Sequence, residues 1–184
     1  MNNLIPDILT TERLLLREIN PLIYHQVMTG LNEGEIKEFF GFTTGEEVAY
    51  ERERFKQGVT MAGRSFLYFH LMELSTKIVV GWGGYHTIFT QHKRAELGYV
   101  LNEDQFKGKG YMKEALPHII QYGFESMKLH RIEALIEPNN IPSLKLINRF
   151  GFTKEGTLRD HYMKNNKLED SVLFSLLPYE YLKT

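Results

Sequence analysis

The chain has 184 residues, a formal net charge of −1, 42% hydrophobic and 24% charged residues, and no cysteine. This composition is usual for a soluble globular protein of one domain, and the small charge gives no reason to expect nucleic-acid or membrane binding. The lack of cysteine excludes disulfides, thiolate metal ligands and a cysteinyl acyl-enzyme.

Helix signals mark the N-terminal third of the chain. Asn20 predicts a helix N-cap, followed by Pro21 at the first helical position, where its missing N–H does no harm. The run Thr44-Gly45-Glu46-Glu47 predicts a capping box and a second helix toward Ala62. The acidic segment 33–41 between them is expected to be a loop or a short helical turn. Its carboxylates either meet a cationic amine or are solvated surface groups.

Alternating apolar residues and turn residues predict a sheet in the middle and at the end of the chain. The expected strands are residues 13–19, 66–72, 78–86, 94–101, 131–137, 152–158 and 171–177. Apolar residues at three- and four-residue spacing predict a long helix over 110–127. A shorter helix, 141–150, begins at the cap Asn140 and ends before Gly151. This order predicts one α+β domain spanning residues 1–184.

The most informative segment is Gln105-Phe106-Lys107-Gly108-Lys109-Gly110, between an expected strand and the long helix. Two glycines allow a tight turn with successive exposed N–H groups, which together with the helix N-terminus favour a phosphate. The order of residues is neither that of a P-loop nor that of a dinucleotide fingerprint. Taken alone, the segment is equally explained as a glycine turn that caps a helix.

The pattern Gln-x-x-Gly-x-Gly resembles the acetyl-coenzyme A signature of the GCN5-related N-acetyltransferases, the GNAT superfamily. Four further blocks resemble its ribosomal-protein alanine and serine N-acetyltransferase branch, and they fall in the same order. They are Thr11 to Arg17, Ala95 to Leu101, Asn140 to Ser143 with Phe150-Gly151-Phe152, and Glu155 to Arg159 with Leu168 to Leu173. Together these blocks extend from one end of the chain to the other.

The resemblance implies a mixed, mostly antiparallel sheet, flanked by helices, in which two central parallel strands splay apart in a V. The pantetheine arm of acetyl-CoA would enter this gap and contact the backbone of Tyr99, Val100 and Leu101. The pyrophosphate would be held by Phe106, Lys107, Gly108, Lys109, Gly110, Tyr111 and Met112. Asn140 and Ser143 would contact the pantetheine or lie near the sulfur.

The implied reaction passes the acetyl group directly from a thioester to an amine. An amine that is mostly protonated at pH 7 needs a base, and Glu96 is the candidate. Its alternative role is that of a strand glutamate paired with Arg94 or Lys93. Many members of the superfamily carry a tyrosine acid where this chain has Ile147, so Ser143 is the substitute acid, or else a residue that assists the helix cap. His161 and Tyr162 in the expected terminal hairpin are weaker candidates for the acid.

The preferred acceptor is a protein or peptide N-terminal α-amine, such as that of a ribosomal protein. A small amine, such as a polyamine or an aminoglycoside, is the first alternative, and a non-catalytic acyl-CoA-binding protein is the second. Trp82 and Tyr85 either face the acceptor or belong to the core. No metal is expected, because the histidines lack ligand spacing. The start of the chain predicts no secretory signal, so a cytoplasmic location is expected, and a homo-oligomer is left open.

Overall fold

The computed structural model describes residues 8–57 and 65–181. Within them, eight strands form one mixed sheet in the order β1-β2-β3-β4-β5-β6-β8-β7. The strands are β1 (Ile8–Thr10), β2 (Leu14–Ile19), β3 (Ser65–Glu73), β4 (Val79–Phe89), β5 (Arg94–Leu101), β6 (Arg131–Ile136), β7 (Thr153–Lys164) and β8 (Lys167–Leu176). The helices are α1 (Pro21–Gly30), α2 (Glu33–Phe40), α3 (Gly45–Gln57), α4 (Tyr111–Glu125), α5 (Ile141–Arg149) and α6 (Pro178–Tyr181). The predicted α+β class is confirmed, and in the described part of the chain no helix is long and apolar enough to cross a membrane.

The chain folds as two compact units. The first comprises Met1–Thr87 with Tyr99–Ile119, and the second comprises Ile88–Gly98 with Ile120–Thr184. The end of β5 therefore belongs to the first unit and its beginning to the second. A single domain over residues 1–184 stays a prediction.

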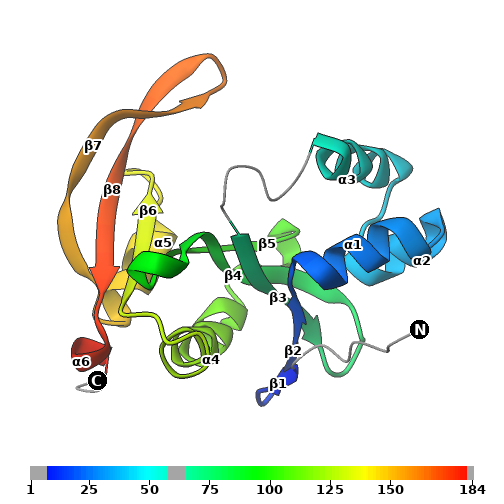
Figure 1. Ribbon diagram of the computed structural model, residues 1–184, viewed down its shortest axis with the longest axis horizontal. Helices are drawn as coiled ribbons and strands as arrows, with labels where there is room; N and C mark the ends of the chain where they lie inside the picture. Colours follow the sequence, from blue (N-terminus) through cyan, green and yellow to red (C-terminus); the bar gives the residue numbers. More distant parts are fainter. Residues whose placement is uncertain (1–7, 58–64, 182–184) are drawn as a thin grey trace. The chain divides into compact units, whose positions relative to one another are not determined.

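In the first unit, α1, α2 and α3 lie together beside β2 and β3 (Figure 1). Their apolar faces meet in a core in which Tyr24 is only 2% exposed. The Tyr24 ring makes edge-on contacts with Phe40 and Phe66, with centroids 5.9 and 5.8 Å away. Such aromatic pairs add roughly 0.5–1.5 kcal/mol each beyond the apolar area that they bury. The core therefore fixes how the three helices are placed on these strands.

Hydrogen bonds confirm the predicted helix starts and settle the conformation of residues 33–41. The Asn20 side chain accepts from two N–H groups of α1, and the Glu47 N–H donates to the Thr44 hydroxyl at 3.2 Å to open α3. Helix α3 ends at Gln57, and residues 58–62 of the longer expected helix lie outside the described residues. Of the loop and the short helical turn expected at 33–41, the helical alternative is confirmed, because Asn32 and Glu35 form a capping box and Glu33–Phe40 is helical.

The second unit contains the parallel pair of the sheet. Strands β5 and β6 pair through Arg94↔Arg131, Ala95↔Ile132 and Glu96↔Glu133. The V-shaped splay expected beyond these residues stays a prediction. Strand β6 also pairs antiparallel with β8, which forms a long curved hairpin with β7 (Figure 1). This hairpin runs to Lys164, six residues beyond the strand expected to end at Leu158, because residues on both sides of the Asp160 irregularity continue to pair with β8.

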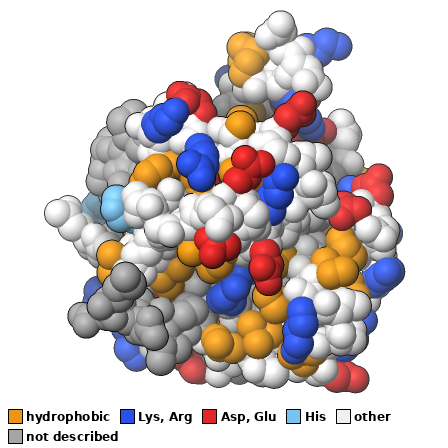
Figure 2. All heavy atoms as spheres, turned by 90° about the vertical axis from the view of Figure 1, so that its right-hand side faces the viewer, with side chains coloured by type: hydrophobic (Ala, Val, Ile, Leu, Met, Phe, Trp, Pro, Cys, Tyr) orange, Lys and Arg blue, Asp and Glu red, His pale blue; other side chains and the backbone are white. Residues whose placement is uncertain are grey.

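The surface carries charges of both signs. On the face drawn in Figure 2, acidic and basic side chains alternate among small hydrophobic areas. This mixture agrees with the formal net charge of −1, which results from 22 basic and 23 acidic residues. Interspersed charges of this kind favour solubility over a strong long-range field of one sign.

Candidate active site

The glycine segment lies in the first unit as predicted, between the end of β5 and the start of α4. Gly108 and Gly110 adopt φ values of +74° and +84°, a region in which side chains other than hydrogen are strained. A Cβ built on Gly108 would meet nothing within 4 Å, so this part of the turn is open. The first N–H groups of α4 have no partners within the helix. The segment therefore offers a concave run of donors that fits a pyrophosphate.

The side chains of this segment divide between the core and the surface. Phe106, Tyr111 and Met112 are buried, with exposed fractions of 8, 4 and 8%, so their contribution toward a ligand would come from the backbone. Lys107 pairs with Asp104 at 2.5 Å, and both side chains are exposed. The segment is therefore anchored by apolar side chains while its glycines and lysines face outward.

The predicted pantetheine contacts occupy the last residues of β5, also in the first unit. Val100 is 43% exposed, whereas Tyr99 and Leu101 are partly buried. Strand β4 approaches closely here, since a Cβ on Gly81 would lie 2.2 Å from the Val100 carbonyl oxygen. Gly81 must therefore remain without a side chain for β4 to run beside this end of β5.

A pocket of about 600 Å³ in the first unit is lined by α1, α3, β3 and β4. Aromatic side chains dominate its wall, among them Tyr24, Phe66, Tyr68, Trp82 and Tyr85. Tyr85 is 1% exposed, and its hydroxyl donates to the Ile119 carbonyl at 2.8 Å. The interpretation of Tyr85 as a core residue is therefore confirmed, and whether the ring also faces the acceptor stays a prediction. No local pattern in the sequence predicts this pocket, since its wall comes from segments far apart in the chain.

Both carboxylates of the pocket, Glu47 and Glu51, have partners within the protein. The Tyr24 hydroxyl donates to Glu51 at 2.5 Å, and the Arg54 guanidinium donates to the other oxygen of Glu51 at 2.9 Å. Glu47 accepts backbone N–H bonds from Thr44 and Thr43, which lower its pKa. Burial lowers the pKa of His70 to about 3, so this ring is neutral at pH 7. The pocket is therefore aromatic, and its carboxylates are already engaged.

In the second unit, Glu96 lies beside Glu133 in the parallel pair β5–β6. Glu133 accepts hydrogen bonds from Arg94 Nη1 at 2.7 Å and from Arg131 Nε at 2.8 Å. Burial, followed by the charge of Glu133, raises the pKa of Glu96 to about 6, and His161 acts in the opposite direction. Glu96 therefore has the properties of a proton acceptor that works near neutral pH. Sequence reasoning missed Glu133, although two charged residues on an otherwise apolar strand were a signal.

The β7–β8 hairpin brings two further groups into electrostatic range of Glu96. The Tyr162 pKa is raised by burial and by the charge of Glu96. The His161 ring contacts the Tyr162 ring edge-on at 4.4 Å, and its Nδ1 lies 3.1 Å from the Ser171 hydroxyl. These two residues, which were the weaker sequence candidates for the acid, therefore belong to the environment of Glu96.

The later half of the predicted cofactor site lies at the start of α5. The Asn140 side chain accepts the Ser143 N–H at 3.2 Å and so caps this helix. The cap uses the backbone of Ser143, which leaves its partly buried hydroxyl without a structural role in the cap. Ile147, at the position of the usual tyrosine acid, is completely buried. The roles proposed for Asn140 and Ser143 stay predictions.

The model of the acetyltransferase (GNAT) domain family matches residues 13–153. The N-acetyltransferase p20 of Bacillus licheniformis is 35% identical over 177 residues, which are 95% of this chain and 98% of that protein. An acetyltransferase of the GNAT family from Bacillus anthracis has a TM-score of 0.65 at 26% identity, covering 95% of this chain and all of that one. The chain therefore belongs to the GNAT family of N-acetyltransferases, enzymes that use acetyl-CoA as cosubstrate.

Relatives named for different acceptors match this chain. The [ribosomal protein uS5]-alanine N-acetyltransferase of Escherichia coli is 34% identical over 113 residues, 61% of this chain and 58% of that protein. The spermidine N(1)-acetyltransferase of the same organism is 23% identical over 91 residues, 50% of this chain and 48% of that protein.

Within the described residues, no three His, Asp or Glu side chains gather as a metal ion would require.

Proposed function

We propose that this N-acetyltransferase acetylates the α-amine at the N-terminus of a peptide or protein. The observation that carries this proposal is the Glu96 carboxyl, whose pKa is raised to about 6. An α-amine has a pKa of about 7.7–8.0, whereas a lysine-like primary amine has about 10.4. The pKa of an α-amine therefore exceeds that of Glu96 by roughly 2, and the pKa of an alkylamine exceeds it by more than 4. Proton transfer to Glu96 is accordingly less unfavourable from an α-amine.

Two residues of the second unit carry the proton transfers in this proposal. Acetyl-CoA supplies a thioester, whose acetyl group moves to the amine nitrogen while the CoA thiol is released. Glu96 accepts the proton that the amine loses, directly or through one water molecule. Ser143 passes a proton to the departing sulfur and regains one from solvent, to which Glu96 releases the proton that it accepted. A backbone N–H binds the negative charge that develops on the carbonyl oxygen. No covalent enzyme intermediate is required.

The cosubstrate is assigned to the residues that the resemblance implied. The backbone of Phe106, Lys107, Gly108, Lys109, Gly110, Tyr111 and Met112 would hold the pyrophosphate. The positive φ values of both glycines and the open space at Gly108 support this assignment. Tyr99, Val100 and Leu101 would meet the pantetheine arm through the backbone, and Asn140 with Ser143 would meet its far end.

The aromatic pocket of the first unit is our candidate for binding the acceptor. It includes Gly81, which closely approaches Val100, and Asn102, which directly follows the end of β5. A polyamine would need carboxylates for its second ammonium group, yet Glu51 is paired with Arg54 and hydrogen-bonded to Tyr24. An aromatic wall suits the uncharged side chain beside an α-amine better than it suits a polycation.

An acceptor panel tests the proposal. The protein is incubated with acetyl-CoA and either peptides with free small N-terminal residues, the same peptides with a blocked N-terminus and an internal lysine, spermidine, or an aminoglycoside. Mass spectrometry then locates the acetyl group. Acetylation at the α-amine alone is expected, and uS5-derived N-terminal peptides are a natural first choice. Efficient acetylation of spermidine or an aminoglycoside with inert N-terminal peptides would reject the proposed acceptor.

A second arm tests catalysis itself. If acetyl-CoA binds but is not consumed with any acceptor, the chain acts as an acyl-CoA-binding protein. Because Glu96→Gln removes the proposed base, it should abolish transfer in the same panel while CoA binding persists. Equal product formation by the variant would show that another group deprotonates the amine.

A further inference from the structure

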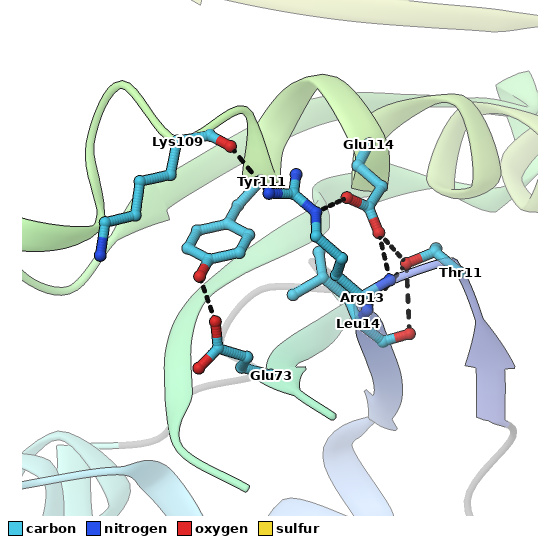
Figure 3. A network of polar contacts seen from close by, with 7 residues as sticks. All are labelled: Thr11, Arg13, Leu14, Glu73, Lys109, Tyr111 and Glu114. Carbon is cyan, nitrogen blue, oxygen red and sulfur yellow. Dashed lines mark hydrogen bonds and ion pairs between the residues drawn. The ribbon is translucent and has the colours of Figure 1, made fainter. Parts of the chain in front are cut away.

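Thr11 and Arg13, which lie just before β2 in the first unit, bind one carboxylate of the helix that follows the glycine segment 105–110. This carboxylate belongs to Glu114, in the first turns of α4. One oxygen of Glu114 accepts from the Thr11 hydroxyl at 2.5 Å and from the Arg13 backbone N–H at 2.7 Å. The other oxygen accepts from Arg13 Nε at 2.7 Å. Figure 3 shows these three bonds converging on Glu114 from the residues that enter β2.

The Glu114 carboxylate is held in its charged form. Burial would raise its pKa, but the hydrogen bonds from Thr11 and Arg13 outweigh burial and lower it. Its side chain is 16% exposed, whereas that of Arg13 is 44% exposed. A partly buried, charge-assisted and multiply bonded pair of this kind is more rigid and stronger than an ordinary surface ion pair.

Arg13 also bonds to the backbone of the glycine segment and so connects it to Glu114. Its Nη1 donates to the Lys109 carbonyl oxygen at 3.0 Å. The peptide bond between Lys109 and Gly110 is trans, so its N–H points away from the carbonyl that Arg13 holds. Arg13 therefore fixes the direction in which the Gly110 N–H is presented, on the side of the turn opposite to its own guanidinium.

A second attachment limits the motion of Arg13 itself. Its guanidinium carbon lies 5.0 Å from the centre of the Tyr111 ring. The Tyr111 hydroxyl donates to Glu73 at the end of β3, as Figure 3 shows. Glu73 also accepts from the Thr76 hydroxyl at 2.8 Å. The guanidinium is thus confined between the Tyr111 ring and Glu114, and two of its nitrogens donate within the protein.

The geometry points to Thr11, Arg13 and Glu114 as positioning residues for acetyl-CoA, which hold the glycine segment in the conformation that receives the pyrophosphate. This inference rests on the proposed use of the segment for that group. The three residues act through the backbone of the segment and not by touching the ligand. Preorganisation of this kind lowers the cost of ordering the segment on binding, so its loss weakens affinity without altering the proton transfers at Glu96.

The test compares Glu114→Gln, Arg13→Gln and Thr11→Val with the wild type. Glu125→Gln is the matched control, since Glu125 ends the same helix and accepts a side-chain bond from Gln121 at 3.0 Å. Titration calorimetry with CoA should show a dissociation constant raised ~10-fold or more in Glu114→Gln and Arg13→Gln. Thr11→Val removes one of the three bonds to Glu114, together with two bonds between the Thr11 hydroxyl and the Leu14 backbone. It should show a smaller rise, and Thr11→Ser, which keeps the hydroxyl, should retain wild-type affinity.

Kinetics separate positioning from a general structural role. The KM for acetyl-CoA should rise in parallel with the dissociation constant, while kcat at saturating acetyl-CoA stays within about twofold of the wild type. Melting temperatures measured without ligand show whether each variant is folded. If Glu114→Gln or Arg13→Gln is not folded, the uncharged substitution Thr11→Val still tests the inference. Unchanged CoA affinity in folded Thr11→Val and Glu114→Gln would overturn the inference, as would an equal loss in Glu125→Gln. A wild type that fails to bind CoA would instead reject the proposed role of the glycine segment.

Discussion

Glu96 and Glu133 are direct neighbours in the register of the parallel pair β5–β6, and two arginines, Arg94 and Arg131, donate hydrogen bonds to Glu133. Glu133 places a negative charge beside Glu96. That charge, added to burial, raises the pKa of Glu96 to about 6. A carboxyl group whose pKa is moved toward neutral pH by burial and a charged neighbour is common where protons are exchanged.

Replacing Glu96 with Gln keeps the shape of the side chain and removes its capacity to accept a proton. We expect turnover to fall by roughly 10²-fold or more while the dissociation constant of CoA stays nearly constant. Steady-state kinetics and calorimetry on the same preparation measure both quantities. Wild-type turnover of this variant between pH 6 and 9 would remove Glu96 from the mechanism.

The pH dependence of kcat/KM should carry the signature of Glu96. Activity rises with pH through about 6, because Glu96 must lose its proton before it can accept one from the amine. Glu133→Gln removes a negative neighbour and should move this limb to lower pH. His161→Asn removes the opposing influence and should move it to higher pH. Shifts of the same sign in both variants would contradict this electrostatic account.

Stability should respond to the same carboxyl. The native pKa of Glu96 lies above the unfolded value of about 4.3, so the native state binds more protons between these two values. The free energy of unfolding therefore decreases as pH rises through this window. Glu96→Gln lacks this loss, so thermal melts should show it gaining stability relative to the wild type between pH 4 and pH 7. A constant difference would show that the shift is not present in the native state.

Ser143→Ala tests the proton donor. The cap of α5 uses the backbone N–H of Ser143, which alanine retains, so the helix and the melting temperature should be preserved. Loss of the hydroxyl should lower kcat by about 10²-fold if it protonates the sulfur. His161→Asn, measured in parallel, tests whether the His161 ring of the β7–β8 hairpin donates the proton instead. Full activity of Ser143→Ala would assign the proton to another group or to water.

Two substitutions of Gly108 distinguish the effect of backbone strain from the effect of a side chain that blocks the ligand. Valine at φ +74° is strained, so Gly108→Val combines an altered turn with a side chain at the proposed phosphate site. Asparagine tolerates this conformation, so Gly108→Asn should fold with a near-native melting temperature. Both variants should bind CoA more weakly, without any requirement for Mg²⁺. Unchanged affinity in both folded variants would show that the pyrophosphate binds elsewhere.

Local signals in the sequence predicted much of the fold. Asn20 and Thr44 were recognisable helix caps because their partners lie two or three residues away. Helix α2 was expected only as a loop or a short helical turn, because the glycines and acids of 33–41 are typical of both, although Asn32 and Glu35 have capping-box spacing. The positions of the glycine segment and of Glu96 followed from family motifs.

The missing parts of the candidate site depend on contacts between distant segments. Glu133 matters because strand pairing sets it beside Glu96, and the sequence does not state this register. Phe106 and Tyr111 were expected near the ligand, but whether their side chains face it or the core depends on what packs against α4. Arg13 belonged to a recognised motif, yet its link to Glu114 required the folded chain.

The bond between Thr11 and Glu114 joins residues 103 positions apart, and the neighbouring Arg13–Glu114 bonds span 101 positions. The glycine turn itself is formed by neighbouring residues, but its bracing closes a chain loop of this length, which costs entropy and slows folding. During refolding, the turn can form early, whereas its attachment must wait for β2 to join the sheet. CoA binding should therefore recover in step with the docking of the N-terminal strand, after helix content has returned.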